Sequence, residues 1–242
     1  MVKMTKEEFI KLVSNFSVNI NSDILDKLEI YKDFLKEYNT HTNLTAIKKD
    51  EDIYLKHFYD SLTLCSVVDL NGINTLLDIG SGAGFPGMVL KIFYPHLHVT
   101  LLDSNNKKTK FLELLKEKLK LNDVEVINDR VENITKERLN HYELVTARAV
   151  TNLTILTELA MPLVKPNYYF VPLKGSNYEE IEEAKFAINK MHGEIGLIKN
   201  IDLPLEAGLR NIIKITKNNL TNIREIRSYN NIIKKPLKKI LK

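Results

Sequence analysis

A cluster of glycines places the strongest constraint on how this chain folds. The sequence has 242 residues and nine glycines, and four of these lie within eight residues: Gly80, Gly82, Gly84 and Gly87. They follow the apolar run Thr75–Ile79, and a helix is predicted to begin beyond them at Pro86, where the missing N–H of proline costs nothing. Such a turn leaves bare backbone at the carboxyl edge of a sheet, where doubly wound α/β folds bind nucleotides.

The pattern after Asn71 predicts an α/β domain, because short apolar runs alternate with amphipathic segments. The predicted strands are Thr75–Ile79, His98–Asp103, Val124–Asn128, Glu143–Ala147 and Tyr168–Leu173. The predicted helices are Pro86–Phe93, Lys107–Leu121, Thr135–Leu139, Asn152–Leu163 and Tyr178–Met191. Two later runs, Ile195–Lys199 and Asn211–Thr216, are expected to be antiparallel strands at one edge. We therefore expect a seven-stranded, mostly parallel sheet with helices on both faces.

The first seventy residues are predicted to be helical, at Thr5–Val13, Asp23–Tyr38 and Glu51 to Val68. The expected organisation is a helical extension over residues 1–70, a main domain over 71–217 and a basic tail over 218–242.

Composition indicates a globular, cytoplasmic protein, with 44% hydrophobic and 27% charged residues. No stretch approaches the roughly 20 apolar residues of a membrane span, and the charged N-terminus does not resemble a secretion signal. The single cysteine, Cys65, excludes an intramolecular disulfide and a zinc site built on paired thiolates. We expect no membrane contact and no metal.

Positive charge is concentrated at the C-terminal end. From Lys214 onward there are nine basic residues and one acid, whereas the rest of the chain has 26 basic and 30 acidic residues. Two interpretations remain open from charge alone: a contact with a polyanion such as RNA, or a solvated, partly disordered terminus.

The glycine frame favours S-adenosylmethionine over a dinucleotide. Residues 82–87 match G-x-G-x-x-G, but the first glycine after the strand is Gly80, and the frame from Asp78 is D-x-G-x-G-x-G. An acid at Asp78 would face a phosphate unfavourably, but it suits a sulfonium and an ammonium. Asp103 ends the second strand, where a carboxylate can accept hydrogen bonds from both ribose hydroxyls. NAD enzymes also have an acid at this position, so Asp103 indicates an adenosine ribose without distinguishing the two cofactors.

The motifs together resemble the small-subunit ribosomal RNA methyltransferase G family, also called glucose-inhibited division protein B. The resemblance rests on Leu77-Asp78-Ile79-Gly80-Ser81-Gly82-Ala83-Gly84-Phe85-Pro86-Gly87, Leu101-Leu102-Asp103-Ser104, Asn43-Leu44-Thr45-Ala46-Ile47, Lys56-His57-Phe58-Tyr59-Asp60-Ser61-Leu62, Asp129-Arg130-Val131-Glu132, Thr146-Ala147-Arg148-Ala149-Val150 and Leu173-Lys174-Gly175.

The resemblance implies a class I, Rossmann-like S-adenosylmethionine-dependent methyltransferase that modifies guanine N7 in 16S ribosomal RNA near the decoding site. It implies that Gly80 and Phe85 contact the cofactor, that Val131 and Glu132 flank its adenine, and that Arg148 lies by its methionine end. The full expected cofactor set is Asp78, Gly80, Gly82, Gly84, Phe85, Asp103, Val131, Glu132 and Arg148. The chain departs from the family's usual C-terminal motif, of which it keeps only Arg227 ahead of Lys234 and Lys235.

Guanine N7 has a free lone pair and no proton, so the reaction is expected to be a direct displacement without a general base. We therefore expect no catalytic acid or base, and positioning by Arg148, His57 and Asp60, although His57 could equally be a helix-packing residue. The expected partner is 16S RNA in the small ribosomal subunit, bound by a monomer through Lys107, Lys108, Lys174, Arg227, Lys234 and Lys235. Two alternatives stay open: a methyltransferase with another substrate, and a ribosome-binding module without turnover.

Overall fold

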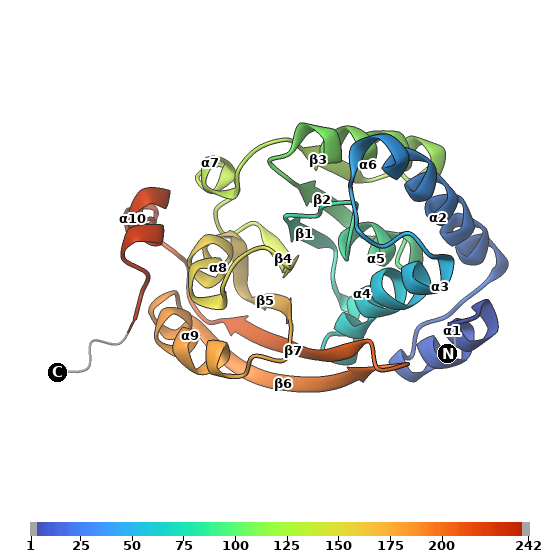
Figure 1. Ribbon diagram of the computed structural model, residues 1–242. Coiled ribbons are helices and arrows are strands. Elements are labelled where there is room, and N and C mark those ends of the chain that lie inside the picture. The colour runs from blue at the N-terminus through green and yellow to red at the C-terminus, as the bar shows by residue number, and fades with distance from the viewer. Residues whose placement is uncertain (1–3, 239–242) are drawn as a thin grey trace.

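The computed structural model describes residues 4–238, which are built around one seven-stranded sheet (Figure 1). The strand order is β3-β2-β1-β4-β5-β7-β6, in which β1 to β5 are parallel and β7 is antiparallel to both β5 and β6. The strands are β1 Thr75–Ile79, β2 His98–Leu102, β3 Val124–Ile127, β4 Tyr142–Arg148, β5 Val164–Lys174, β6 Gly193–Leu203 and β7 Gly208–Lys217. The predicted fold class is confirmed, including the antiparallel edge.

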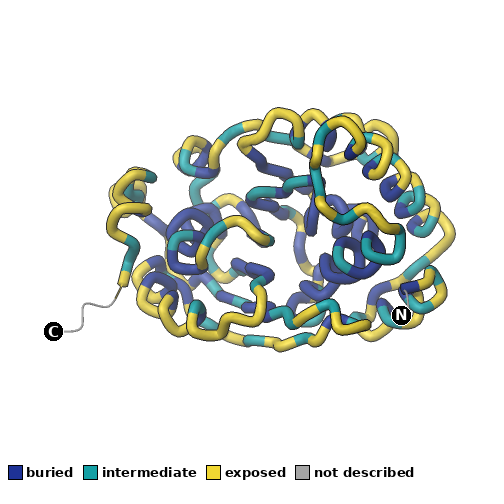
Figure 2. The backbone as a smooth tube through the Cα atoms, in the orientation of Figure 1, coloured by how far each residue is buried: buried dark blue, intermediate teal, exposed yellow. Residues whose placement is uncertain are grey.

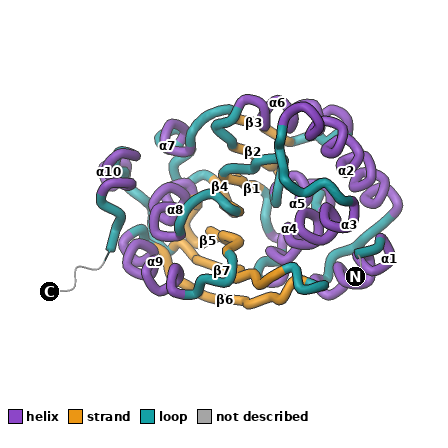
Figure 3. The backbone as a smooth tube through the Cα atoms, viewed as in Figure 1, coloured by secondary structure: helices purple, strands orange, loops and turns teal. Residues whose placement is uncertain are grey.

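Helices cover both faces of the sheet, and the buried backbone lies between these layers (Figures 2 and 3). One face carries α1 Lys6–Val13, α2 Ser22–Thr42, α3 Asp50–Ile53, α4 Asp60–Leu62, α5 Gly87–Phe93 and α6 Asn106–Lys118. The other carries α7 Val131–Ile134, α8 Leu153–Ala160, α9 Glu179–Lys190 and α10 Tyr229–Lys234. A π-helical segment, Tyr54–Tyr59, joins α3 to α4. Within residues 4–238 no helix has the length and apolar character needed to cross a membrane.

The N-terminal helices pack directly on the glycine loop. Helix α2 begins after an Asn21 cap and buries the predicted apolar stripe that contains Leu28, Tyr31 and Leu35. The Tyr31 hydroxyl donates to the carbonyl of Ala83, and its ring stacks on Phe85 with centroids 5.3 Å apart. These helices therefore form the outer support of the loop.

Two expectations about secondary structure are wrong. The helix predicted over Thr135–Leu139 lies instead at Val131–Ile134, because Val131 and Ile134 are the apolar pair that packs against α8 and its neighbours. Helix α5 begins at Gly87, with Pro86 in the cap position.

The basic tail is folded over residues 218–238, so its interpretation as a disordered terminus is wrong for this part. Asn140 holds Thr221 through two hydrogen bonds, and Ile232 of α10 is buried in the same core cluster as α8. Residues 239–242, which complete the tail, lie outside the described range.

Candidate active site

The glycine loop is held open at the carboxyl end of β1. The amides of Gly80 and Ser81 both donate to the carbonyl of Leu102, at 2.7 and 3.0 Å, so the loop is tied to the end of β2. Gly82 has φ +61°, and a side-chain carbon there would find no atom closer than 3.9 Å. The loop therefore exposes bare backbone at Gly82 in a conformation that favours glycine.

Asp103 follows β2 and faces this loop. One of its carboxylate oxygens accepts the amide of Gly82 at 2.9 Å, and the other accepts the amide of Asn105 at the same distance. Lys108, in the first turn of α6, lies 3.7 Å from the carboxylate. Each carboxylate oxygen has a second lone-pair site, which leaves capacity to accept hydroxyl donors.

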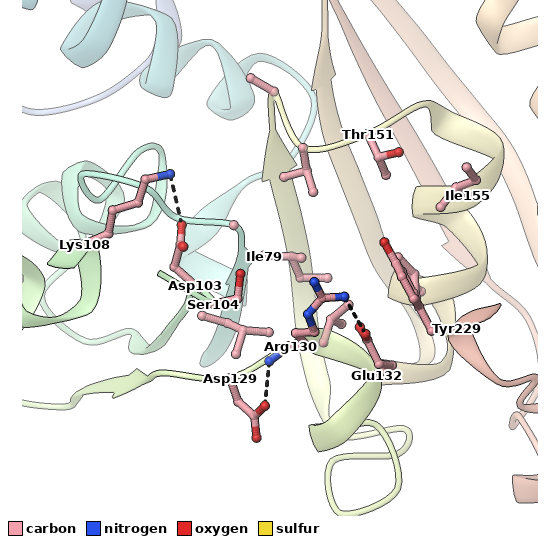
Figure 4. A pocket seen from close by; sticks show the side chains of 16 residues that line it. Ile79, Asp103, Ser104, Lys108, Asp129, Arg130, Glu132, Thr151, Ile155 and Tyr229 are labelled. Carbon is pink, nitrogen blue, oxygen red and sulfur yellow. Dashed lines mark hydrogen bonds and ion pairs between the residues drawn. The ribbon is translucent and has the colours of Figure 1, made fainter. Parts of the chain in front are cut away.

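A cavity of about 400 Å³ opens beside Asp103 and the loop (Figure 4). That volume is in the range of small-molecule sites. Figure 4 shows Asp103, Ser104 and Lys108 on one side and Ile155 and Tyr229 on the other. The complete lining is Ile79, Gly80, Leu102, Asp103, Ser104, Lys108, Asp129, Arg130, Val131, Glu132, Ala149, Val150, Thr151, Ile155, Leu159 and Tyr229.

A second cavity, of about 360 Å³, lies next to the first. Ala149, just after β4, lines both cavities. The lining of the second cavity is Ile47, Lys56, His57, Asp60, Arg148, Ala149, Leu173, Lys174, Gly175, Ala207 and Arg210. The two cavities thus meet where the strand order reverses between β1 and β4, the position at which doubly wound sheets bind their ligands.

One buried carboxylate organises the second cavity. Asp60 is fully buried, and its two oxygens accept from Arg148 Nη1 and Arg210 Nε, each at 2.8 Å. Arg148 Nη1 also donates to the carbonyl of Lys56 at 3.0 Å. One carboxylate against two guanidiniums leaves a net positive wall, whose donors are held in fixed directions.

His57 is a neutral part of this network. Its ring stacks on Phe85 with centroids 4.1 Å apart. Burial, together with the positive charge of Arg148, lowers the pKa of His57 to about 3. Arg148 Nη2 donates to Nδ1 at 3.2 Å, so the proton is assigned to Nε2, which lies 3.0 Å from the Thr45 hydroxyl. His57 therefore accepts a hydrogen bond from Arg148 and so helps to orient the guanidinium.

Asp78 lies behind the loop, not in either cavity. Its side chain is fully buried, and it accepts the amide of Gly87 at 2.8 Å, at the start of α5. Burial raises the pKa of Asp78 to about 7, although the Gly87 amide and the nearby Arg148 favour its charged form. In this position Asp78 anchors the loop to the start of α5, and its expected contact with the cofactor stays a prediction.

The predicted residues separate into three groups. Gly80, Asp103, Val131 and Glu132 line the first cavity, whereas Arg148, His57 and Asp60 line the second. Gly82 lies in the open loop between β1 and α5. Gly84 and Phe85 are buried beneath it, and a side-chain carbon on Gly84 would come within 2.5 Å of the Tyr31 hydroxyl.

The cations expected to bind RNA also differ in their surroundings. Lys107, Lys234 and Lys235 are exposed, and Lys108 points toward Asp103. Two others are paired within the protein. Lys174 contacts Glu180 at 2.6 Å and the carbonyl of Thr151 at 2.8 Å. Arg227 donates through Nε and Nη2 to both oxygens of buried Glu158, so it holds the tail to α8.

Sequence reasoning missed Arg210 and Tyr229. Arg210 lies 150 positions from Asp60 along the chain, near the start of the antiparallel strand β7 and with no motif around it. Tyr229 is the single aromatic residue in 218–242, a signal that could have separated it from its charged neighbours.

Among residues 4–238, no group of three His, Cys, Asp or Glu side chains is arranged to hold a metal ion.

A comparison with protein families matches most of the chain. The family described as rRNA small subunit methyltransferase G matches residues 24–202. The chain belongs to this family. It is 44% identical over 217 residues to "Ribosomal RNA small subunit methyltransferase G" of Bacillus subtilis, covering 88% of this chain and 91% of that protein. It is 38% identical over 240 residues to the protein of the same name from Staphylococcus carnosus, covering 98% and 100%. The resemblance drawn from the motifs is confirmed.

Solved structures share the fold at low sequence identity. M. jannaschii TYW2 in complex with AdoMet superposes with a TM-score of 0.53 at 14% identity, covering 65% of this chain and 74% of that one. The antibiotic-resistance methyltransferase Kmr superposes with a TM-score of 0.52 at 14% identity, covering 63% of this chain and 91% of that one. These similarities show that the sheet and its helices form a methyltransferase-type fold.

Proposed function

We propose that this protein transfers a methyl group from S-adenosylmethionine to N7 of a guanine in 16S ribosomal RNA, near the decoding site. The observation that carries the proposal is the pair of cavities that meet at Ala149. One is lined by Gly80 of the glycine loop and by the carboxylate of Asp103, and the other has a cationic wall. Membership of the family names ribosomal RNA as the substrate.

The first cavity fits the adenosine end of the cofactor. Asp103, which lines the cavity, has lone pairs available for ribose hydroxyls. Its hydrogen-bond partner Gly82 lies in the loop outside the cavity lining and leaves space for a ligand to approach the backbone. Val131, Ile155 and Leu159 offer an apolar wall that suits a purine. When bound there, S-adenosylmethionine supplies an activated methyl group on its sulfonium.

The second cavity fits a guanine. Guanine presents O6 and N7 as neighbouring acceptors, and arginine is the side chain that most often pairs with this edge. A guanidinium donor on O6 alone, from Arg148 or Arg210, would hold the base and leave the N7 lone pair free. Asp60 fixes both guanidiniums, so the donors are oriented before the base arrives.

No proton needs to move in the methyl transfer, and the side chains agree with that. His57, with a pKa lowered to about 3 by burial and by Arg148, is neutral and already accepts a hydrogen bond. Burial raises the pKa of the Cys65 thiol to about 12, so it is no nucleophile at neutral pH. The rate then derives from alignment of N7 with the methyl group, an effect worth up to roughly 7–11 kcal/mol.

The setting proposed for this activity is the cytoplasm, with the small ribosomal subunit as partner, the protein acting as a monomer and no metal taking part. N7 is nucleophilic without activation, which is why the reaction needs no Lewis acid.

The test is methyl transfer to small ribosomal subunits, and to naked 16S RNA, taken from cells that lack this protein. With tritiated cofactor, we expect one labelled guanine, located by mass mapping as 7-methylguanine. Stable subunit binding without label would indicate a ribosome-binding module. Affinity for NAD with none for S-adenosylhomocysteine would restore the dinucleotide interpretation.

A further inference from the structure

We propose that the C-terminal tail is part of the cofactor site, and that Tyr229 stacks against the adenine of S-adenosylmethionine. This rests on the proposed function in one respect, namely that the first cavity holds this cofactor. The proposal assigns a binding role to a segment whose charge had suggested RNA contact alone.

The tail is fixed to the domain at several points before it reaches the cavity. Thr221 is buried, donates its amide to Asn140 at 3.0 Å, and accepts from the Asn140 side chain at 3.1 Å. Arg227 then forms a bidentate ion pair with Glu158 of α8, and its Nη1 donates to the carbonyl of Lys235 at 2.9 Å. The residues that flank Tyr229 on both sides are therefore held in place.

Tyr229 itself forms one side of the cavity. It is half-buried at the start of α10, where it packs against the core cluster that contains Val131, Leu156 and Leu159. The guanidinium of Arg130 lies over its ring, 5.4 Å from the centroid. Figure 4 shows the tyrosine opposite Asp103, with Arg130 and Glu132 between them in this view, and all four residues line the cavity.

The position of Asp103 indicates which part of the ligand reaches this side. A carboxylate that accepts ribose hydroxyls fixes the sugar at one side of the cavity, so the purine extends toward the apolar side. Ile155 and Tyr229 form that side, and they belong to the same apolar cluster as Val131 and Leu159, which also line the cavity. A planar purine gains from an aromatic face, and base–aromatic stacking typically changes affinity by about tenfold.

Binding of S-adenosylhomocysteine and of methylthioadenosine, measured by calorimetry on the full chain, tests the proposal. We expect Tyr229→Ala to weaken both ligands by about tenfold, because both carry the adenosine moiety, and Tyr229→Phe to bind both as wild type does. The matched control is Leu220→Ala, which changes a residue of the same tail that is 67% exposed and outside the cavity. It should leave both affinities unchanged.

A second variant separates stacking from simple anchoring of the tail. Tyr229→Leu keeps an apolar side chain for packing but has no aromatic face, so we expect it to lose several-fold in affinity while limited proteolysis of the tail stays as in wild type. Wild-type affinity in Tyr229→Leu or Tyr229→Ala would overturn the proposal. A wild-type protein that fails to bind S-adenosylhomocysteine would instead overturn the proposed function.

Discussion

Single residues at this site act mainly by fixing their neighbours. Asp60 holds Arg148 and Arg210, His57 accepts from Arg148, and Asp103 accepts the amide of Gly82. In each case a buried or half-buried acceptor fixes the direction of a donor before any ligand is present. Such preorganisation is what the proposed displacement without acid–base catalysis requires.

Gly82 offers the sharpest test of the glycine loop as a ligand contact. In Gly82→Asp a carboxylate would lie beside that of Asp103, in the space left open for the ligand, so we expect affinity for S-adenosylhomocysteine to fall by at least about 100-fold. The positive φ at Gly82 should cost about 1 kcal/mol of stability, which leaves a cooperative fold. Calorimetric titration and thermal unfolding measure the two effects.

The control for this substitution is Gly72→Asp, because a side chain at Gly72 has free space and no unusual backbone angle. It should bind the cofactor as wild type does. Unchanged affinity in Gly82→Asp would mean that the ligand does not approach the loop.

The pH dependence of methyl transfer tests the role of His57. Its pKa of about 3 lies far below the unperturbed value of 6.5, so the ring stays neutral from pH 6.5 to 8.5 and loses no charge in that window. Titration of His57 should therefore cause little variation in the single-turnover rate between pH 6.5 and 8.5 when both substrates are saturating. His57→Gln should lower the rate at every pH without adding a sloping limb to the pH profile.

Two other profiles would have distinct meanings. A rate that rises with unit slope through pH 6.5 and is flattened by His57→Gln would indicate a general base and count against guanine N7. A limb near pH 7 that His57→Gln preserves and Asp78→Asn removes would belong to Asp78, whose pKa burial raises to about 7.

At the scale of elements, the ends of strands determine where the chemistry lies. The carboxyl ends of β1, β2 and β4 carry the loop, Asp103 and Arg148, and the π-helical segment Tyr54–Tyr59 brings Lys56 and His57 against them. Strand β7 runs in the opposite direction, so its first residues, including Arg210, reach the same edge. The antiparallel strand thus contributes to a site otherwise built from parallel ones.

Arg210→Met is expected to impair RNA methylation without affecting the cofactor. Loss of a charged donor typically costs about 1.5–3 kcal/mol, so kcat/KM for small subunits should fall by roughly 10- to 100-fold. Affinity for S-adenosylhomocysteine should stay unchanged, because Arg210 lines only the second cavity. Arg224→Met, which removes an exposed arginine, serves as the control. Equal loss of cofactor affinity in Arg210→Met would contradict a separate base cavity.

Local patterns predicted the sheet and about half of the site. All seven strands were found because each is a short apolar run between turns, and Gly80 and Asp103 follow strands whose ends meet at one edge. Arg210 and Tyr229 could not be found in that way, since tertiary packing alone brings them to the site. The sequence pattern also could not predict where the Asp78 side chain points, because its hydrogen-bond partner is the first amide of α5, nine residues further along the chain.

For the whole molecule, the tail has one side against the first cavity and another exposed to solvent. Its inner side contributes Tyr229 to the first cavity and Arg227 to the pair with Glu158, whereas Lys234 and Lys235 remain exposed on its outer side. Truncation after Thr216 would therefore disturb the cofactor site as well as any RNA contact. Substitution of the exposed lysines alone separates these effects.

The double variant Lys234→Gln, Lys235→Gln is expected to weaken binding to 16S RNA and to reduce its salt dependence. Each lysine that neutralises a phosphate contributes close to 0.7–0.9 to the slope of log affinity against log salt, so the slope should decrease by about one to two. Affinity for S-adenosylhomocysteine should not change, because neither side chain lines the first cavity. The matched control is the double variant Lys11→Gln, Lys120→Gln, because both of these lysines are also exposed. Lys120 follows the end of α6 that lies away from Asp103. An equal decrease in the control would indicate a general effect of net charge, and an unchanged slope in the tail variant would mean that these lysines face solvent and not RNA.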